Sequence, residues 1–461
     1  MHNDRIKLIY EGNDPSGSYV LYWMQQSQRV LYNHALYYAI EKSNQEHLPL
    51  VVVFNILPNY KDANLRHYMF MLEGLKEVSD TLNHLNITFI LTYGDPTFSL
   101  ERVFRDASLI IMDKAYLKPG RKMRNDVYLM MRDKFIDKTI YQIESDVIVP
   151  VRSVYLKPAY GAYTIRPTLM KHIDTYLDIN DIPIYQMNQS YPIKGDLEIT
   201  QYQEWVKTLP IDMSVKPYPK FKGGYLEAKK HLNEFLNDKF MNYMDRSDPS
   251  LVVQSYMSLY LHFGQISPMD IYKFVTSNQQ IVDLKEELDA FIEQLIVRRE
   301  LAFNFVSYHT DYDKFSGMTE DWAYMTIDQH KQDIRPVLYE LGELELSKTQ
   351  DPYFNAAMTE MRLTGFMANY MRMYWAKKIM EWSKDMKTAY ERIVFLNNKY
   401  FIDGRDPNSY SNIAWCFGKH DRPWQERPIF GKLRYMNDQG LKRKFNMDAY
   451  LEFVENIDQS K

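Results

Sequence analysis

Apolar and polar positions in the first third of the chain alternate between two patterns, one typical of buried strands and one typical of amphipathic helices. Mostly apolar runs, as strands buried on both faces require, occupy 19–23, 48–56, 87–94 and 109–113. Helical patterns occupy 27–42, 64–85 and 99–108. This alternation predicts an α/β domain with a parallel sheet and helices on both of its faces. No G-x-G-x-x-G follows any of these strands, so the usual dinucleotide fingerprint is absent.

The pattern weakens after the first 150 residues and then changes. Eight prolines interrupt 149–220, which we interpret as a connecting segment partly wrapped over the domains. A poorly patterned piece of the first domain explains the same residues equally well. From Gly223 and Gly224 onward, apolar residues recur at a spacing of three to four. The sequence therefore predicts an α/β domain at 1–150, a connector at 151–220 and an all-helical domain at 221–461.

Composition narrows the class of protein. A chain of 461 residues with 45% hydrophobic and 25% charged residues is typical of a soluble protein with two or three domains. The N-terminus has no apolar segment of the signal type, and no apolar run approaches 18 residues, so we expect a cytoplasmic protein without a membrane helix. The single cysteine, Cys416, excludes an internal disulfide and a cysteine-based metal site, and we expect no metal.

A helix predicted at 367–382 carries four Met and two Trp beside Asn369 and Arg372. Core packing is the commoner explanation of such a surface, and a bound π-system is the alternative. Arg372 favours the second, because a buried arginine needs a fixed anion. Asp403, in the D-G-R-D-P turn of 403–407, is a candidate for that anion.

Two further segments carry polar groups on helical patterns. Gln254, Ser255 and Ser258 precede or open a helix, where they suit either phosphate binding or simple capping. Glu300 lies on a largely apolar helix beside Arg298 and Arg299. A carboxyl group there is either salt-bridged or has a raised pKa, the state that can share a proton.

The C-terminal region is basic and aromatic, although the whole chain has a net charge of −4. Between Lys419 and Lys444 eight Lys or Arg face three Asp or Glu, a local charge of +5, with Trp and Tyr interleaved. Basic side chains contact phosphates and flat rings stack on bases. A solvated surface is the alternative to nucleic-acid binding.

Six motifs together give the sequence a specific resemblance. They occur in the order "YWMQQSQRVLYNHAL", "YLHFGQIS", "VRREL", "NYMRMYWAKKIMEW", "DGRDPN" and "HDRPW…GKLRYM" and span nearly the whole chain. The chain resembles the class II cyclobutane pyrimidine dimer photolyases of the photolyase/cryptochrome family. The resemblance implies an N-terminal Rossmann-like α/β domain, a long linker and a C-terminal all-helical domain that holds a U-shaped FAD. It also implies light-dependent repair of pyrimidine dimers in double-stranded DNA by a monomeric lyase, with reduced FAD donating an electron to the dimer.

The resemblance assigns roles to particular residues. It implies that the FAD phosphates lie at Tyr243, Ser255, Met257 and Ser258, and that Arg372 and Asp403 form a salt bridge beside the isoalloxazine. Asn397 would face the flavin N5, and the remaining cofactor residues would be Gln254, Asn304, Asn369, Gly404 and Arg405. Glu300 would bind the dimer carbonyls. The residues expected against the dimer or the DNA are Met373, Trp415, Arg422, Trp424 and Arg434.

One position departs from the family pattern in a way that matters for electron supply. The resemblance implies a surface-to-flavin chain that includes Trp375 and Trp382, but Phe354 stands where its middle Trp is usual. Trp375 and Trp382 are about 10 Å apart along a helix axis. Because Phe is far harder to oxidise than Trp, we predict poor photoreduction of oxidised FAD with repair intact once the flavin is reduced.

Two alternatives and one open point remain at this stage. A cryptochrome-like light sensor without repair activity has the same expected fold, and a DNA-binding protein that has lost its flavin is the second alternative. An antenna chromophore of unknown identity could occupy the N-terminal domain, and the sequence does not identify it.

Overall fold

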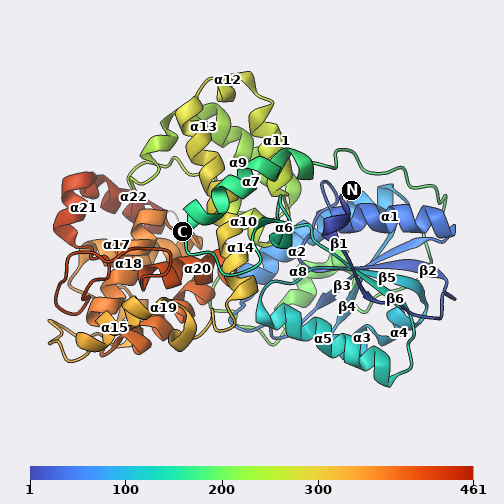
Figure 1. The fold of residues 1–461 in the computed structure, drawn as a ribbon, viewed down its shortest axis with the longest axis horizontal. Coiled ribbons are helices and arrows are strands. Elements are labelled where there is room, and N and C mark those ends of the chain that lie inside the picture. Colours follow the sequence, from blue (N-terminus) through green and yellow to red (C-terminus); the bar gives the residue numbers. More distant parts are fainter. Residues whose placement is uncertain (460–461) are drawn as a thin grey trace.

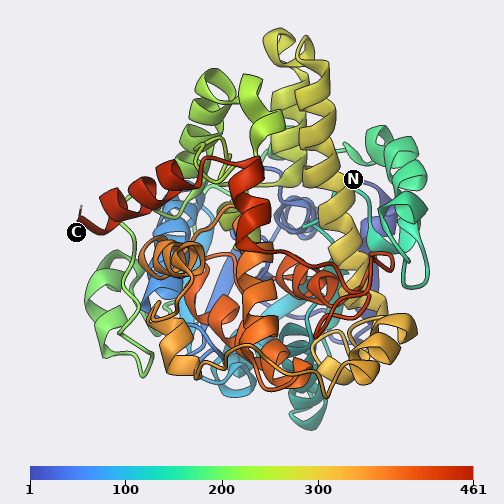
Figure 2. The same cartoon turned by 90° about the vertical axis from the view of Figure 1, so that its left-hand side faces the viewer.

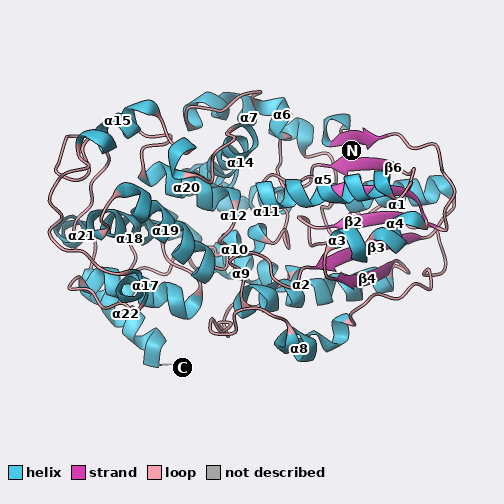
Figure 3. Ribbon diagram, turned by 90° about the horizontal axis from the view of Figure 1, so that it is seen from below, coloured by secondary structure: helices cyan, strands magenta, loops and turns pink. Residues whose placement is uncertain are grey.

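A computed structural model describes residues 1–459 and places a six-stranded sheet at one end of the molecule and a helical region at the other (Figures 1 and 3). The strand order is β1-β6-β5-β2-β3-β4. All neighbouring pairs are parallel except β1 and β6, which pair antiparallel at one edge. The strands are β1 (Ile6–Tyr10), β2 (Tyr19–Met24), β3 (Leu50–Ile56), β4 (Thr88–Tyr93), β5 (Ala107–Asp113) and β6 (Thr139–Ile143).

The helices that cover the sheet follow its strands along the chain. Their apolar faces form two cores, one on each face of the sheet, as the α/β pattern predicts. These helices are α1 (His34–Glu46), α2 (Leu65–His84), α3 (Pro96–Ser99), α4 (Glu101–Arg105) and α5 (Lys118–Asp133). The edge strand β1, the helix α5 and the strand β6 lack the continuous apolar runs on which the sequence prediction relied.

The predicted helix at 27–42 is wrong at its start, because α1 begins only at His34. The carboxylate of Asp113, at the end of β5, accepts hydrogen bonds from the backbone N–H groups of Gln25, Gln26 and Ser27 at 2.9–3.0 Å. Asn33 then caps the helix by accepting from the N–H of Leu36. The contact with Asp113 of β5, far away in the sequence, therefore holds the segment before His34 as a loop.

The segment predicted as a connector runs across both regions. It begins with α6 (Val151–Val154) and α7 (Ala162–Tyr176), which pack against the helical region (Figure 1). It continues through α8 (Tyr202–Trp205), whose flanking turns pack against α2. This course agrees with a wrapped connector, while the boundaries at 150 and 220 stay a prediction.

The helical region is built from α9 (Tyr225–Asp238) onward; its later helices form a separate core, whereas the helices between residues 225 and 292 share a core with one face of the sheet. Figure 2 faces this end and shows the C-terminal helices on its outer surface. The helices that position the site are α10 (Met257–His262), α14 (Arg299–Tyr308), α17 (Pro352–Thr364), α18 (Asn369–Trp382), α19 (Met386–Tyr400) and α20 (Pro407–Cys416). The others are α11 (Pro268–Thr276), α12 (Gln279–Val282), α13 (Lys285–Ile292), α15 (Asp321–Gln329), α16 (Leu341–Glu345), α21 (Asp438–Lys444) and α22 (Met447–Gln459).

The described residues include no helix long and apolar enough to cross a membrane. They also include no group of three His, Cys, Asp or Glu side chains placed to hold a metal ion. The cysteine Cys416 is buried and free.

Candidate functional site

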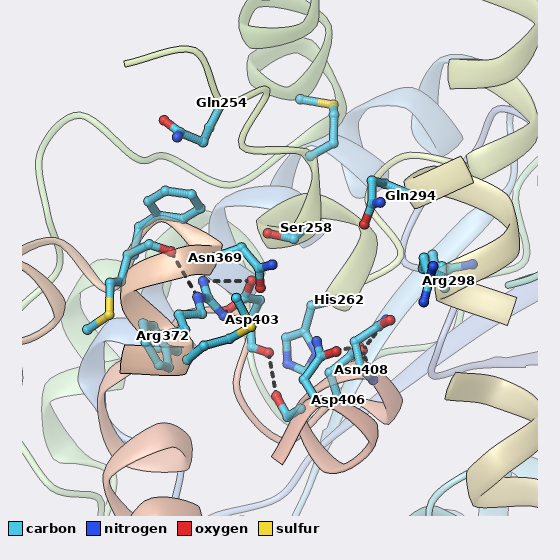
Figure 4. Close-up of a pocket in the computed structure, with 18 of the residues that line it drawn as sticks. Gln254, Ser258, His262, Gln294, Arg298, Asn369, Arg372, Asp403, Asp406 and Asn408 are labelled. Atoms are coloured by element: carbon cyan, nitrogen blue, oxygen red, sulfur yellow. Dashed lines mark hydrogen bonds and ion pairs between the residues drawn. The ribbon is translucent and has the colours of Figure 1, made fainter. Parts of the chain in front are cut away.

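A cavity of about 520 Å³ opens among the helices of the C-terminal half (Figure 4). Segments far apart in the sequence contribute its walls, from the chain before α10 to the last turn of α20. The lining residues that the sequence analysis had already assigned are Tyr243, Gln254, Ser255, Met257, Ser258, Asn369, Arg372, Met373, Trp375, Asn397, Asp403 and Trp415. The fold therefore brings most of the expected cofactor residues together around one cavity.

The pair of Arg372 and Asp403 is the central ionic feature of this cavity. The guanidinium donates two parallel hydrogen bonds, from Nη1 to Oδ1 at 3.0 Å and from Nη2 to Oδ2 at 3.2 Å. Its Nε donates to the carbonyl of Met367 at 2.9 Å, and its plane lies 3.9 Å from the ring centroid of Phe401. The anion that the half-buried Arg372 on α18 pairs with is therefore Asp403, held by a two-point contact that fixes both side chains.

Charge and shape around the cavity suit the FAD that the resemblance implies. Arg246, Arg298, Arg299 and Arg372 line it against two carboxylates, Asp403 and Asp406, so cations are in excess. Flat or apolar side chains complete the walls, namely Met257, Leu261, Phe291, Leu295, Phe366, Met367, Met373, Trp375, Ile393, Phe401, Ile413 and Trp415. A dinucleotide with two phosphates and two ring systems matches that division of charge and apolar surface.

An unsatisfied polar atom supports the same fit. The indole Nε1 of Trp375 is buried and has no hydrogen-bond partner among the described residues, although the residue lines the cavity. Buried donors in native structures nearly always have a partner. The geometry therefore favours a ligand that offers an acceptor at this wall.

Glu300 and three residues expected at the cofactor, Asn304, Gly404 and Arg405, do not line the cavity. Glu300 is buried on α14, where its carboxylate accepts the N–H of Ile148 at 2.6 Å and that of Val149 at 3.4 Å. Burial raises its pKa to about 7, against the lowering effect of those N–H donors. Its expected contact with the dimer carbonyls therefore lacks support, because the carboxylate instead caps the backbone between the sheet and the connector.

Asn304, Gly404 and Arg405 also serve the fold instead of the cavity. The Asn304 carboxamide accepts from the N–H of Ala159 at 2.8 Å and donates to backbone carbonyls of the connector. A Cβ at Gly404 would lie 2.8 Å from the carbonyl oxygen of Asn397, which explains the need for glycine. The Arg405 guanidinium, expected at the cofactor, is buried against the carbonyl groups of Asn398 and Asp62.

The aromatic residues of the expected electron path lie on α17 and α18. Trp375 reaches the cavity wall, whereas Trp382 is buried further along α18 and does not line it. The ring of Phe354 is fully buried, 5.1 Å from the Trp382 ring centroid in an edge-on arrangement. The structure therefore places Phe354 beside the outer tryptophan of the path.

A second hollow, of about 300 Å³, lies beside the first at the basic C-terminal region. The Arg434 guanidinium lines the hollow and lies 5.0 Å from the ring of Trp424 there and 5.4 Å from the ring of Trp415, which lines the cavity. Arg422, which is exposed, lies 5.4 Å from the Trp424 ring. The lining side chains include four cations and no carboxylate, namely Tyr370, Trp424, Gln425, Arg427, Arg434, Tyr435, Met436, Asn437, Gly440, Leu441, Arg443 and Lys444.

Sequence analysis missed several lining residues. Arg246 and Gln294 stand in segments without a distinctive pattern, whereas His262 and Asn408 lie in the motifs YLHFGQIS and DGRDPN but were given no role. His262 pairs with Asp406 at 3.1 Å (Figure 4). The excess of basic and aromatic residues after Lys419 was a usable signal for the hollow. No signal in the sequence pointed to Tyr370, which joins the hollow from α18.

Comparison with known proteins gives one family and one fold. The family model described as DNA photolyase matches residues 20–184. A deoxyribodipyrimidine photo-lyase of Methanothermobacter thermautotrophicus is 40% identical over 99% of this chain and 99% of its own. One of Arabidopsis thaliana is 34% identical over 98% of this chain and 93% of its own.

Solved structures agree at the level of the fold. A bacterial class III photolyase from Agrobacterium tumefaciens has a TM-score of 0.73 at 15% identity, covering 95% of this chain and 86% of its own. A Synechocystis cryptochrome has a TM-score of 0.71 at 15% identity, covering 95% of this chain and 88% of its own. An archaeal photolyase from Sulfolobus tokodaii, solved with two FAD molecules, has a TM-score of 0.70 at 15% identity, covering 95% of this chain and 89% of its own. The predicted two-part architecture is thereby confirmed.

Proposed function

Because the chain belongs to the DNA photolyase family, we propose that it repairs DNA by splitting cyclobutane pyrimidine dimers in a light-dependent reaction. Similarity to photo-lyases over nearly the full chain supports the class of reaction. The observation that carries the assignment to this chain is the cavity built around the Arg372–Asp403 pair. Its walls hold the residue types that FAD requires.

The protein supplies binding and electrostatics, and the cofactor supplies the electron. The chemistry that reduced FAD would supply here, when bound and excited by light, is the reversible donation of one electron to the dimer. A cyclobutane dimer offers no leaving group and no readily attacked carbonyl, which is why such chemistry is needed. The residues that would hold the cofactor are Arg246 and Arg298 in the cationic wall, and those that would orient it are Arg372, Asp403 and Asn397.

The dimer enters from the side of the cavity that Met373 and Trp415 line. Both side chains are partly exposed, so they can pack against a lesion without rearrangement of the core. A dimer inside duplex DNA cannot reach this depth unless it is turned out of the helix, and its weakened stacking lowers the cost of that step. We infer that these two side chains exclude water from the lesion and hold it against the cofactor.

The basic hollow beside the cavity is the proposed contact with the remaining DNA. Arg434 and Trp424 stand at the boundary of the two openings, where a guanidinium and an indole can fill the gap that the extruded bases leave. Arg427, Arg443 and Lys444 add positive charge at which DNA phosphates can bind. A local cationic surface thus accounts for DNA binding by a chain whose net charge is −4.

A light sensor without repair activity is the second candidate, favoured only by the shared fold of the Synechocystis cryptochrome. The photo-lyase relatives, at 34% and 40% identity, favour repair. An illuminated and a dark sample of the reduced holoprotein with a thymine-dimer oligonucleotide separate the two. Loss of dimers in the light alone supports repair, whereas survival of all dimers beside fully reduced FAD contradicts it.

The flavin itself needs a separate measurement. The visible absorption spectrum of the purified protein should show an FAD band. Its release on denaturation should give one FAD per chain, and protein without a flavin that also fails to bind added FAD would contradict the proposed cofactor. In the experiment with the thymine-dimer oligonucleotide, an undamaged oligonucleotide of the same sequence is the matched control for DNA binding.

A further inference from the structure

The orientation of the buried side-chain carboxamide of Asn398, behind the cavity, is fixed by neighbouring groups that can only donate or only accept a hydrogen bond. The backbone N–H of Arg405 donates to Oδ1 of Asn398 at 3.1 Å, and Nδ2 of Asn398 lies 3.3 Å from a carboxylate oxygen of Asp62. A backbone N–H can only donate and an ionised carboxylate can only accept. Asn398 therefore presents its oxygen toward Arg405 and its amide nitrogen toward Asp62.

That orientation determines the next side chain. Nδ2 of Asn397 donates to the same oxygen of Asn398 at 3.1 Å. Because that oxygen can only accept, the group of Asn397 that contacts it must be the NH₂ group. Its carbonyl oxygen is left without a donor among the described residues, and Asn397 lines the cavity while 6% exposed. The oxygen is therefore available to accept a hydrogen bond from a ligand in the cavity.

We propose that Asp62 and Asn398 are positioning residues that hold Asn397 with its carbonyl oxygen toward the cofactor. This inference rests on the proposed function, because it takes the ligand to be FAD. A ring nitrogen that carries a proton satisfies the oxygen, whereas one that offers a lone pair opposes it. Of oxidised FAD and fully reduced FAD, only the reduced form carries a proton at N5. The arrangement therefore favours the reduced state, the one that repair requires.

The N-terminal domain fixes this arrangement from outside. Asp62 lies between β3 and α2, and the start of α2 is bonded to the end of α19 at several points. Nδ2 of Asn64 donates to the carbonyl of Lys399 at 2.6 Å, and Nη1 of Arg66 donates to that of Tyr400 at 2.8 Å. The distance from Asp62 to Asn398 is thus set by rigid elements of both domains.

Two variants of Asp62 that carry the same charge test whether the hydrogen bonds from Asp62 through Asn398 to Asn397, called the relay below, orient Asn397. Asp62→Gly and Asp62→Asn remove the same negative charge, and both residues tolerate the positive φ of 60° at this position. Asn retains an oxygen acceptor for Asn398, and Gly does not. The readout is the reduction potential of the bound FAD in the holoprotein, measured by equilibration with a reference dye.

We expect the ratio of reduced to oxidised FAD at a fixed potential to be about tenfold lower in Asp62→Gly than in Asp62→Asn, a shift of about 30 mV for a two-electron couple. Asn398→Ala should shift in the same direction relative to the wild type. Asn55→Ala removes another buried carboxamide, within the sheet, and should leave the potential unchanged. Equal potentials in the two Asp62 variants would overturn the proposal.

The Asp62 pair decides the question even if Asn398→Ala fails to fold, because Asp62 is only partly buried. A wild-type potential in a folded, FAD-loaded Asn398→Ala protein would also overturn the relay. Failure of the proposed function is distinguishable, since it would appear in the wild type as missing FAD or missing repair. Failure of the relay appears only in variants of a wild type that has both.

Discussion

The ion pair of Arg372 and Asp403 gives the most direct test of what stabilises the cavity. Arg372→Ala removes a guanidinium that makes two parallel hydrogen bonds to Asp403 and one to the carbonyl of Met367. The Asp403 carboxylate then stays in the cavity wall, with its side chain 9% exposed and without its cation. We expect loss of stability and loss of FAD binding from the same cause.

The magnitude follows from the burial of the two partners. Removal of one member of a buried ion pair costs about 3–5 kcal/mol, because the other charge is left without compensation. The Arg372 side chain is 24% exposed, so solvent screens part of the effect, and we expect about 2–3 kcal/mol. In a domain of roughly 200 residues this lowers the Tm by roughly 4–12 °C.

The assay is a double-mutant cycle on the FAD-free protein, with Arg372→Ala, Asp403→Ala and the double variant compared in thermal unfolding. Side chains in direct contact should show a coupling energy of about 2 kcal/mol. FAD titration of the same four proteins reports the loss of binding separately. The exposed pair of Lys76 and Asp80, whose atoms approach to 2.5 Å, is the matched control.

The cycle has a clear negative outcome. The same cycle at Lys76 and Asp80 should give less than about 1 kcal/mol, because an exposed pair is solvated before and after the change. If the effects of Arg372→Ala and Asp403→Ala simply add, the two residues do not act as a unit. The reasoning about an anion demanded by a buried arginine would then be refuted.

Three further predictions concern electron supply, pH and DNA. Phe354→Trp places an oxidisable ring beside Trp382 and should speed photoreduction of oxidised FAD, at a cost of about 1–3 kcal/mol for overpacking; an unchanged rate in the folded variant would argue against this electron path. Burial raises the pKa of Glu360 from 4.5 to about 7, so its contribution to stability is present below pH 4.5 and is lost as the pH rises to about 7. Wild-type protein should therefore lose about 3 kcal/mol relative to Glu360→Gln over that range in denaturant unfolding, and parallel pH profiles would contradict the prediction. Arg443→Ala should weaken binding of dimer-containing DNA and reduce the slope of log K against log salt by about 1, whereas an unchanged slope would exclude a phosphate contact.

Local pattern was enough to predict four of the six strands of the sheet. The strands β2, β3, β4 and β5 fall within one or two residues of the predicted runs, because a strand buried on both faces must be apolar at nearly every position. No residue of β1 is fully buried, so this strand carries no such run, although β4 at the opposite edge does. The antiparallel pairing of β1 with β6 depends on a partner more than a hundred residues away.

The residues of the candidate site also differ in how well the sequence predicted their partners. Arg372 attracted attention because its charge on an apolar helix needed an explanation, and the turn around Asp403 supplied a chemically suitable partner. Glu300 raised the same question on the same kind of helix, yet its partners are the backbone N–H groups of Ile148 and Val149. Residue chemistry shows that a buried charge must be satisfied, but it does not show which group satisfies it.

The sequence by itself determined the succession of elements and a cationic C-terminal surface, since these depend on spacing and composition, while the flavin residues were implied by the family resemblance of its motifs. The tertiary structure decided that α1 starts at His34, that Arg405 belongs to the domain contact and that Tyr370 joins the basic hollow. In each case the deciding contact joins residues separated by a long stretch of chain. Hydrogen-bond partners at such separations are chosen by the packing of whole elements, which local sequence does not encode.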